Sequence, residues 1–374
     1  MKKELEIYVH IPFCMKKCGY CDFLSAPADE TTQNHYVGAL LREIRYYGEL
    51  CRDREVSTIY IGGGTPSWLQ AVYMELILKQ LRVSFAIRQD AEISIECNPG
   101  TLTREKLLTY LGCGVNRLSI GLQSTLNEEL ELLGRVHTYE QFVRNYELAR
   151  EIGCHNINVD LMSALPYQTV GKFLTSLRQV AALKPEHISV YSLLIEKGTL
   201  FYDKYKFDVV RREAGMPTEC LPSEEAEYEM FQKTKETLKS NGYVRYEVSN
   251  YAKQSFECRH NIGYWKRSDY LGLGVGAASL IDNVRYLNTR NLDIYIEETK
   301  RIQRILTGEE KQESGGIGRV NLHDEADRID RNGQMEEFMF LGLRMTRGIT
   351  RKEFEEAFHM PIEAVHGEVL SRLA

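Results

Sequence analysis

LEIYVHIPFCMKKCGYCDF, residues 5–23, joins an extended apolar run to a short loop that contains three cysteines. Further extended runs follow at residues 57–63, 92–97, 115–123, 156–162 and 187–193. Segments whose apolar residues recur at helical spacing lie between these runs, for example 33–50 and 139–152. Successive strand–helix units need crossover connections, so the sequence up to about residue 195 predicts an α/β fold with a parallel sheet. The periodicity leaves open whether this sheet is flat or curved into a partial barrel.

Three of the predicted strands alternate polar and apolar residues, which is unusual for a parallel strand covered on both faces. Because side chains alternate across a strand, each strand directs one polar row to one side. These rows are Glu92, Ser94 and Glu96; Arg117, Ser119, Gly121 and Gln123; and Asn156, Asn158 and Asp160. We expect helices over the apolar face and an open polar interior, with Glu96, Gln123 and Asp160 at the carboxyl ends of the strands, where α/β barrels bind ligands. The alternative is a set of edge strands with one solvated face.

The composition is that of a globular chain without a strong charge bias. With 374 residues it fits one large domain and a smaller companion. Hydrophobic residues make up 43% and charged residues 27%, which argues against disorder. The formal net charge of -6 gives no indication of a nucleic-acid partner, because such proteins usually present a basic surface.

The cysteines and the apolar segments indicate where the protein resides. There are nine cysteines, an odd number, and only three lie close together, unlike the pattern of a secreted disulfide scaffold. Charged residues interrupt any apolar stretch near the amino terminus, so no signal peptide is predicted. Residues 270–281 are apolar but too short to cross a membrane. We therefore expect a cytoplasmic protein without a transmembrane segment.

The strand–helix rhythm ends near residue 195. A polar connection is expected over 196–222, a helix over 223–241, extended segments at 243–250 and 272–281, and a helix near 290–306. Residues 308–333 are rich in Gly, Asp and Glu and predict a polar linker or loop. The predicted domains are therefore 1–195, a smaller α+β domain at 196–307, the linker at 308–333, and a helical segment at 334–374.

Cys14, Cys18 and Cys21 have a C-x3-C-x2-C spacing in the loop directly after the first strand. Three thiolates can hold three irons of a [4Fe–4S] cube, whose complete ligation would need a fourth cysteine. The remaining iron is then open to S-adenosylmethionine (SAM), and an electron from the cluster can cleave the sulfonium to a 5′-deoxyadenosyl radical. The alternative is a zinc site completed by His10 or Asp22.

A glycine-rich loop, GGGTPS at residues 62–67, follows the second strand at the same edge of the sheet. Glycines there allow the backbone to approach a ligand closely. The loop lacks the Gly-Lys-Ser/Thr of a phosphate loop. Beside the cysteine loop, it predicts a SAM site whose polar partners are Glu96, Gln123, Arg135 and Asp160.

These motifs together resemble one known family. YVHIPFCxxxCxYCDF, IGGGTPS, IECNPG, SIGLQS, LLGRVHT and NVDLMSALP are similar to the oxygen-independent coproporphyrinogen III oxidase-like branch of the radical SAM superfamily, and within it to the HemW-type heme chaperones. The resemblance implies a partial (β/α)6 TIM-like barrel, a smaller α+β domain and a short helical C-terminal segment. It makes Cys14, Cys18 and Cys21 the cluster ligands. It also implies a SAM-lining set of Tyr8, Gly63, Gly64, Thr65, Glu96, Gln123, Arg135 and Asp160.

Two functions from different classes fit this resemblance: a chaperone that binds heme and passes it to an acceptor protein, and a SAM-dependent coproporphyrinogen III dehydrogenase. The family pattern gives the oxidases a further cysteine two residues after the last cluster ligand. Phe23 occupies that position here, after Asp22. The sequence therefore favours the chaperone and predicts no appreciable coproporphyrinogen decarboxylation.

The stretch from His260 to Trp265 resembles the heme-binding motif of the chaperones. The implied heme contacts are His260, Asn261, Tyr264 and Trp265, with the imidazole as axial ligand and the aromatic rings against the porphyrin. The alternative is a buried histidine in an aromatic core, in which case His10, His137 and His155 are the next candidate ligands.

The expected cofactors are thus a [4Fe–4S] cluster, SAM and heme, and the expected partners are a heme-accepting protein and an electron donor to the cluster. Homodimerisation stays open. The helical segment resembles a domain that normally continues into a terminal strand pair, so we expect the chain to stop partway through it.

Overall fold

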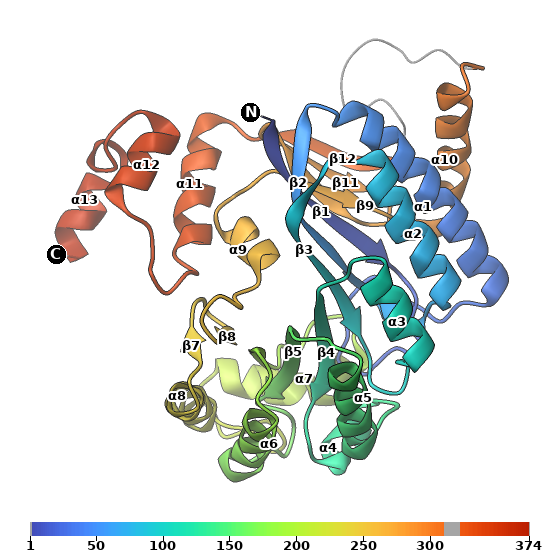
Figure 1. The fold of residues 1–374 in the computed structure, drawn as a ribbon. Helices are drawn as coiled ribbons and strands as arrows, with labels where there is room; N and C mark the ends of the chain where they lie inside the picture. Colours follow the sequence, from blue (N-terminus) through green and yellow to red (C-terminus); the bar gives the residue numbers. More distant parts are fainter. Residues whose placement is uncertain (1, 310–321, 374) are drawn as a thin grey trace.

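The computed structural model describes residues 2–309 and 322–373. The predicted strands all form, and they pair in parallel and in chain order (Figure 1). They are β1 (Lys3–Ile11), β2 (Arg54–Gly63), β3 (Ile87–Cys97), β4 (Arg117–Gln123), β5 (Ile157–Ser163) and β6 (His187–Ser192). This confirms the parallel α/β sheet.

Helices lie between successive strands and cover the apolar face of the sheet. They are α1 (Glu30–Leu50), α2 (Ala71–Ser84), α3 (Arg104–Gly112), α4 (Asn127–Leu133), α5 (Tyr139–Glu151) and α6 (Val170–Ala182). Several start at a side-chain cap, and Thr138 with Gln141 forms a capping box at the start of α5. The apolar row of β4, Leu118, Ile120 and Leu122, is completely buried beneath them. The opposite, polar row of this strand therefore faces the interior.

The sheet continues on both sides of these six strands. One side carries β8 (Asn250–Ala252) and β7 (Val244–Arg245), which follow β6. The other side carries β9 (Tyr270–Leu273), β10 (Ala278–Ile281), β11 (Val284–Asn288) and β12 (His323–Arg328), starting from β1. The strands of the predicted α+β domain thus extend the barrel sheet at its two edges.

Two predicted connections contain regular structure, so those predictions were wrong in part. The segment expected to be a polar connection contains α7 (Leu200–Glu213), which buries Phe201 and Tyr205 and is followed by α8 (Glu224–Ser240). The predicted linker contains β12, which pairs antiparallel with β11. Its residues 310–321 lie outside the described residues.

A buried carboxylate connects α1 to the second half of the chain. Glu43 of α1 accepts hydrogen bonds from the Gly274 amide (2.7 Å), the Asn288 side chain (2.7 Å) and the hydroxyl of Tyr295 (2.6 Å). Tyr295 lies on α10 (Leu292–Leu306), which packs along α1 (Figure 1). Burial raises the pKa of Glu43 to about 7, although these hydrogen bonds oppose the shift.

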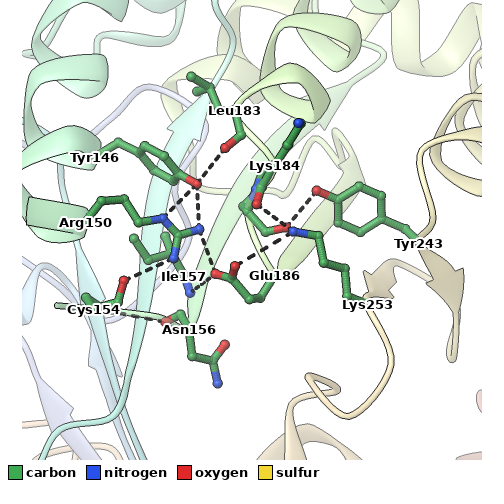
Figure 2. A network of polar contacts seen from close by, with 11 residues as sticks. Tyr146, Arg150, Cys154, Asn156, Ile157, Leu183, Lys184, Glu186, Tyr243 and Lys253 are labelled. Atoms are coloured by element: carbon green, nitrogen blue, oxygen red, sulfur yellow. Dashed lines mark hydrogen bonds and ion pairs between the residues drawn. The ribbon is translucent and has the colours of Figure 1, made fainter.

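A second polar network joins α5, β5 and β6 near the amino ends of these strands. Figure 2 shows Arg150 of α5 at its centre, within 2.7 Å of the Glu186 carboxylate and 2.7 Å of the Tyr146 hydroxyl. Glu186 also accepts from the amide of Ile157, and Lys253 lies 3.8 Å from its other oxygen. One half-buried carboxylate therefore fixes the start of β5 and the chain before β6.

The carboxyl-terminal segment is helical, as predicted. It comprises α11 (Arg331–Gly342), α12 (Arg351–Phe358) and α13 (Glu363–Leu373), which lie to one side of the barrel (Figure 1). A small apolar cluster of Met335, Phe354, Phe358 and Ile362 holds these helices together. Over residues 2–309 and 322–373, no helix is both long and apolar enough to cross a membrane.

Candidate functional site

The interior of the partial barrel contains a cavity of about 400 Å³, within the size range of small-molecule sites. It runs the length of β4, because Arg117, Ser119, Gly121 and Gln123 all line it. Asn158 and Asp160 line it from β5, and Glu96 does so from β3. The polar rows therefore face an open interior, as the sequence predicts.

The alternative of solvated edge strands is excluded by the pairing. β3 lies between β2 and β4, β4 between β3 and β5, and β5 between β4 and β6. None of the three is an edge strand. Most members of the polar rows line one cavity because the sheet curves around them, with helices on the outside; Glu92, Ser94 and Asn156 do not line it.

The loop with the cysteines lies at the carboxyl end of this cavity. Cys14, Cys18 and Cys21 all line it and form no disulfide. The loop is held by backbone hydrogen bonds from Gly19 to Leu133 of α4 and from Phe201 of α7 to Gly19. Burial raises the pKa of Cys14 and of Cys21, so both free thiols keep their protons at neutral pH. Metal binding at these cysteines would therefore release protons.

The donor set fits the cluster predicted from the sequence. Cys14, Cys18 and Cys21 come from one loop and face one cavity, as three ligands of a cube must. In the described parts of the chain, no group of three or more His, Cys, Asp or Glu side chains is arranged around a single ion position, as a site for one metal ion would require. A [4Fe–4S] cube differs, because each thiolate binds its own iron. The identity of the metal at this loop stays a prediction.

His10 is engaged elsewhere and does not line the cavity. Its Nδ1 lies 3.0 Å from the Tyr8 hydroxyl and its Nε2 lies 2.9 Å from the carbonyl oxygen of Leu24. A zinc site completed by His10 would require both contacts to break. Asp22 lines the cavity, so a zinc site completed by Asp22 stays an alternative.

The glycine loop packs directly against the cysteine loop. The amide of Gly64 donates to the carbonyl of Ile11 (2.8 Å), and that of Thr65 donates to the carbonyl of Phe13 (2.7 Å). A Cβ atom on Gly64 would lie 2.6 Å from the Phe13 carbonyl oxygen, closer than van der Waals contact allows. Glycine is needed at this position because two backbone segments meet there.

Glu96 reaches the glycine loop from β3. Its carboxylate accepts from the Gly63 amide (3.0 Å) and from the Tyr60 hydroxyl (3.0 Å). Burial, and then the nearby Asp160, raise the pKa of Glu96 to about 7. Burial likewise raises the pKa of Asp160, whose carboxylate accepts a 2.7 Å hydrogen bond from Asn158. Burial therefore disfavours the charged form of both carboxyls, and a ligand that brings a positive charge or hydrogen-bond donors would favour it.

Gln123 and Arg135 complete the predicted SAM set in the cavity wall. Gln123 ends β4 in a left-handed conformation (φ 75°), where the pairing with β5 shifts register. Such a backbone is costly for a residue other than glycine and is most common at functional sites. The Arg135 guanidinium donates to the Asn98 side chain and the Gly121 carbonyl, and lies 3.8 Å from the Cys18 sulfur. Burial lowers its pKa, but Tyr20 and Cys18 outweigh burial and raise it overall.

Not every residue of the predicted SAM set lies in the wall of this cavity. Gly63, Gly64 and Thr65 line it, whereas Tyr8 does not. The Tyr8 ring stacks at 6.4 Å on that of Tyr60, which does line the cavity. Contact between Tyr8 and SAM therefore stays a prediction.

The predicted heme motif is split between two environments. It forms a short helix, α9 (Arg259–Trp265), and only Asn261 lines the cavity. His260 is buried, with Nδ1 2.7 Å from the Thr58 hydroxyl and Nε2 3.1 Å from that of Tyr264. Its ring stacks at 5.2 Å on Tyr60. This environment is the one that the buried-histidine alternative describes, and heme ligation by His260 stays a prediction.

Tyr264 and Trp265 also contact protein groups rather than an open surface. The Tyr264 ring packs edge-on against Tyr270 of β9, with centroids 4.7 Å apart. The guanidinium of Arg344 lies 4.4 Å above the Trp265 ring. Contact of these two rings with a porphyrin stays a prediction.

The cavity includes residues that the sequence analysis did not assign to a site. Tyr60 of β2 and Ser189 of β6 line it, as does Asn98 after β3. The same alternation that revealed the rows of β3, β4 and β5 would have identified Tyr60 and Ser189. No comparable signal marks Asn98, whose position depends on its contact with Arg135.

Comparisons with known proteins agree with this geometry. The Radical SAM superfamily matches residues 8–180, and the HemN C-terminal domain matches residues 329–374. The chain is 35% identical over 373 residues to the heme chaperone HemW of Bacillus subtilis (strain 168), covering 98% of this chain and 90% of that protein. The chain belongs to the HemW family.

Other relatives of this HemW-family chain support the assignment. The heme chaperone HemW of Escherichia coli (strain K12) is 40% identical over 274 residues, which cover 73% of this chain and 69% of the relative. The solved structure of coproporphyrinogen III oxidase (HemN) from Escherichia coli, described as a radical SAM enzyme, superposes with a TM-score of 0.80. The superposition covers 100% of this chain and 82% of the HemN chain, at 25% sequence identity. These matches confirm the partial radical SAM barrel with a helical carboxyl-terminal segment.

Proposed function

We propose that this chain is a heme chaperone that binds heme and transfers it to an acceptor protein, and that it carries a [4Fe–4S] cluster with exchangeable SAM. The observation that carries the proposal is one cavity that brings three cysteines together with seven of the eight predicted SAM contacts. The chaperone relatives match this chain along nearly all of its length. The proposed location is the cytoplasm, where exposed thiols stay reduced.

The cluster would be held by Cys14, Cys18 and Cys21, and SAM by the residues beside them. Gly63 and Gly64 allow close approach of the SAM amino-acid portion, while Glu96 and Asp160 can accept its ammonium and ribose hydrogens. Arg135, beside Cys18, supplies a positive charge for a carboxylate. A bound cluster would supply a low-potential electron and one open iron.

Heme is a large, flat and mostly apolar ligand, and the cavity has apolar side chains where it opens. Phe23 and Leu194 both line the cavity, yet they are 63% and 67% exposed. Exposed apolar groups beside a ligand site gain when a ligand covers them. This arrangement supports binding of a porphyrin at the mouth of the cavity.

The alternative function is SAM-dependent oxidation of coproporphyrinogen III, as the likeness to HemN suggests. Phe23 disfavours it, because the oxidase pattern has a cysteine there. One experiment separates the two: titrate the reconstituted protein with heme and assay coproporphyrinogen turnover in the same preparation. The proposal expects saturable heme binding at one per chain and no protoporphyrinogen. Several turnovers of protoporphyrinogen without saturable heme binding would overturn it.

Heme ligation by His260 is a separate proposal with a structural condition. His260 could reach iron only if its contacts with Thr58 and Tyr264 break and α9 moves from β2. A His260→Ala variant should then lose heme affinity and shift the Soret band while keeping its cluster spectrum. Unchanged heme affinity would leave His260 with the structural role seen here, and His137 and His155 would be tested next.

A further inference from the structure

A buried arginine at the end of the cavity away from the cysteine loop has no hydrogen-bond partner among residues 2–309 and 322–373. Arg117 begins β4, is 2% exposed, and is among the largest completely buried side chains of the described residues. It lines the same cavity as the cysteine loop. Its Nε has no hydrogen-bond partner, and no hydrogen bond or ion pair joins its guanidinium to any described residue.

This arrangement differs from that of two other buried arginines, Arg54 and Arg135. Arg54 of β2 is similarly buried, but it donates at 2.6 Å to both Asp269 and Asp282. Arg135 donates to Asn98 and the Gly121 carbonyl. A guanidinium has five N–H donors and stays charged, so burying one without acceptors costs several kcal/mol. Such a cost is expected where a ligand provides the acceptor.

Nearby carboxylates influence Arg117 without contacting it. On β3, Arg117 pairs with Ser94, and Glu92 lies two residues before Ser94. The Glu92 carboxylate accepts from the Arg259 amide (2.9 Å), the His260 amide (3.3 Å) and the Cys258 thiol (3.4 Å). Its acceptor capacity is directed to the start of α9. Arg117 acts through space on Asp160 and Glu96, where its positive charge opposes the rise in pKa that burial causes. Glu92 therefore offsets part of the charge but leaves the N–H donors of Arg117 unsatisfied.

The position of Arg117 fixes the kind of ligand group that it can reach. β4 spans six residue steps from Arg117 to Gln123, or about 20 Å of extended strand. The cysteine loop lies at the Gln123 end and Arg117 at the other, with Ser119 and Asn158 between them along the wall. A planar guanidinium facing a cavity is the group that binds a carboxylate through two parallel hydrogen bonds.

We propose that Arg117 is an anion-binding subsite at the floor of the barrel cavity, and that it takes a carboxylate of a ligand that enters from the cluster end. This rests on and deepens the proposed function, because heme carries propionate carboxylates. The amino-acid carboxylate of SAM is not a source, since the proposed SAM site holds it beside Arg135 at the cluster end, about 20 Å along β4.

The test compares ferric heme with its dimethyl ester, which lacks free carboxylates, on the reconstituted full chain. Wild-type protein should bind heme at least tenfold more tightly than the ester, since a charge-assisted hydrogen bond is worth about 10- to 150-fold in affinity. Arg117→Lys keeps the charge but loses the fork, and should remove most of that preference while leaving affinity for the ester unchanged. Arg54→Lys is the matched control and should keep the preference. If wild-type protein binds heme and its dimethyl ester with equal affinity, no heme propionate binds Arg117 and the proposal is wrong.

A parallel SAM titration controls for damage to the rest of the cavity. Arg117→Lys should leave SAM affinity unchanged, because the SAM carboxylate is held at the cluster end; if the variant weakens SAM as much as heme, Arg117 supports the whole cavity and the inference is wrong. If wild-type protein binds heme and its ester equally, the proposed function stands and the subsite is refuted; if it binds neither, the proposed function fails as well. If the heme preference survives Arg117→Lys in a variant that melts like Arg54→Lys, Arg117 is structural and the inference is wrong.

Discussion

A methyl group added at Gly64 should displace the cysteine loop, because it would collide with the backbone of that loop. The new Cβ of Gly64→Ala would lie 2.6 Å from the Phe13 carbonyl oxygen and 3.0 Å from its carbonyl carbon and its nitrogen. All three are backbone atoms. Phe13 cannot easily retreat, because its ring is buried against Tyr36 and its carbonyl accepts from Thr65.

The size of the effect follows from this geometry. Relieving the contact needs a shift of roughly half an ångström, and overpacking of this kind costs about 1–3 kcal/mol. Cys14 directly follows Phe13, so the displacement moves a predicted cluster ligand. If the native loop position is needed for binding, SAM affinity should fall about 5- to 150-fold, at 1.4 kcal/mol per tenfold.

The assay measures iron and sulfide per chain after anaerobic reconstitution, and then the dissociation constant for SAM. The matched control is Gly112→Ala at the end of α3, where the added Cβ would have no atom within 4 Å. Gly112→Ala should behave as wild type. If Gly64→Ala also retains full iron content and wild-type SAM affinity, the close packing of the two loops does not support the site and the reasoning is refuted.

Three further predictions concern the cluster and the stability of the fold. Cys18→Ser should abolish the iron–sulfur absorption while Cys113→Ser, outside the cavity, leaves it intact; the idea fails if both retain it. Glu43 has a pKa of about 7 in the folded protein, against an ordinary value of 4.5 that applies to the unfolded chain. The folded state therefore binds the Glu43 proton more tightly, and up to roughly 3 kcal/mol of stability is present below pH 4 and lost as the pH rises to about 7. Urea unfolding of Glu43→Gln should lack this decline. A Glu43→Gln variant with the same pH profile as wild type would contradict the prediction. Glu186→Gln removes the charge partner of Arg150 and should lower the unfolding free energy by about 1–3 kcal/mol, whereas a change below 0.5 kcal/mol would show that the network of Figure 2 is weak.

The barrel was predictable because its signals are local and repeated. The strand runs, the helical spacing and the polar rows each follow from the period of one element. The convergence of Glu96, Gln123 and Asp160 then follows from the geometry of parallel strands, which end at one edge. Motif resemblance added Arg135, which follows α4 rather than ending a strand.

The remaining elements were missed where local signals are weak. The residues of β12, HDEADR, are all polar or charged except Ala326, and most are exposed. An edge strand of this kind is held by pairing with β11 and carries no apolar alternation. In α7, by contrast, Thr199 caps the helix and Phe201 and Tyr205 share one face, so a signal was present in the segment read as a connection.

The environment of His260 depends on residues distant in sequence. The types and spacing of His260 and Tyr264 fit both a heme ligand and a core histidine. Thr58, which lies 202 positions earlier, contacts one ring nitrogen, and Tyr60 covers one face of the ring. No local pattern reports such contacts. The same holds for Arg117, whose lack of a partner becomes visible only when the strands and α9 are assembled around it.

The most direct test of the account is the EPR spectrum of the reduced cluster as SAM is added. If Cys14, Cys18 and Cys21 leave one iron open toward the barrel cavity, SAM should shift the g-values, and Asp160→Ala should require more SAM for the same change. A spectrum that stays the same at saturating SAM, from protein with a full complement of iron and sulfide, would contradict the assignment of this cavity as a SAM site over the cluster.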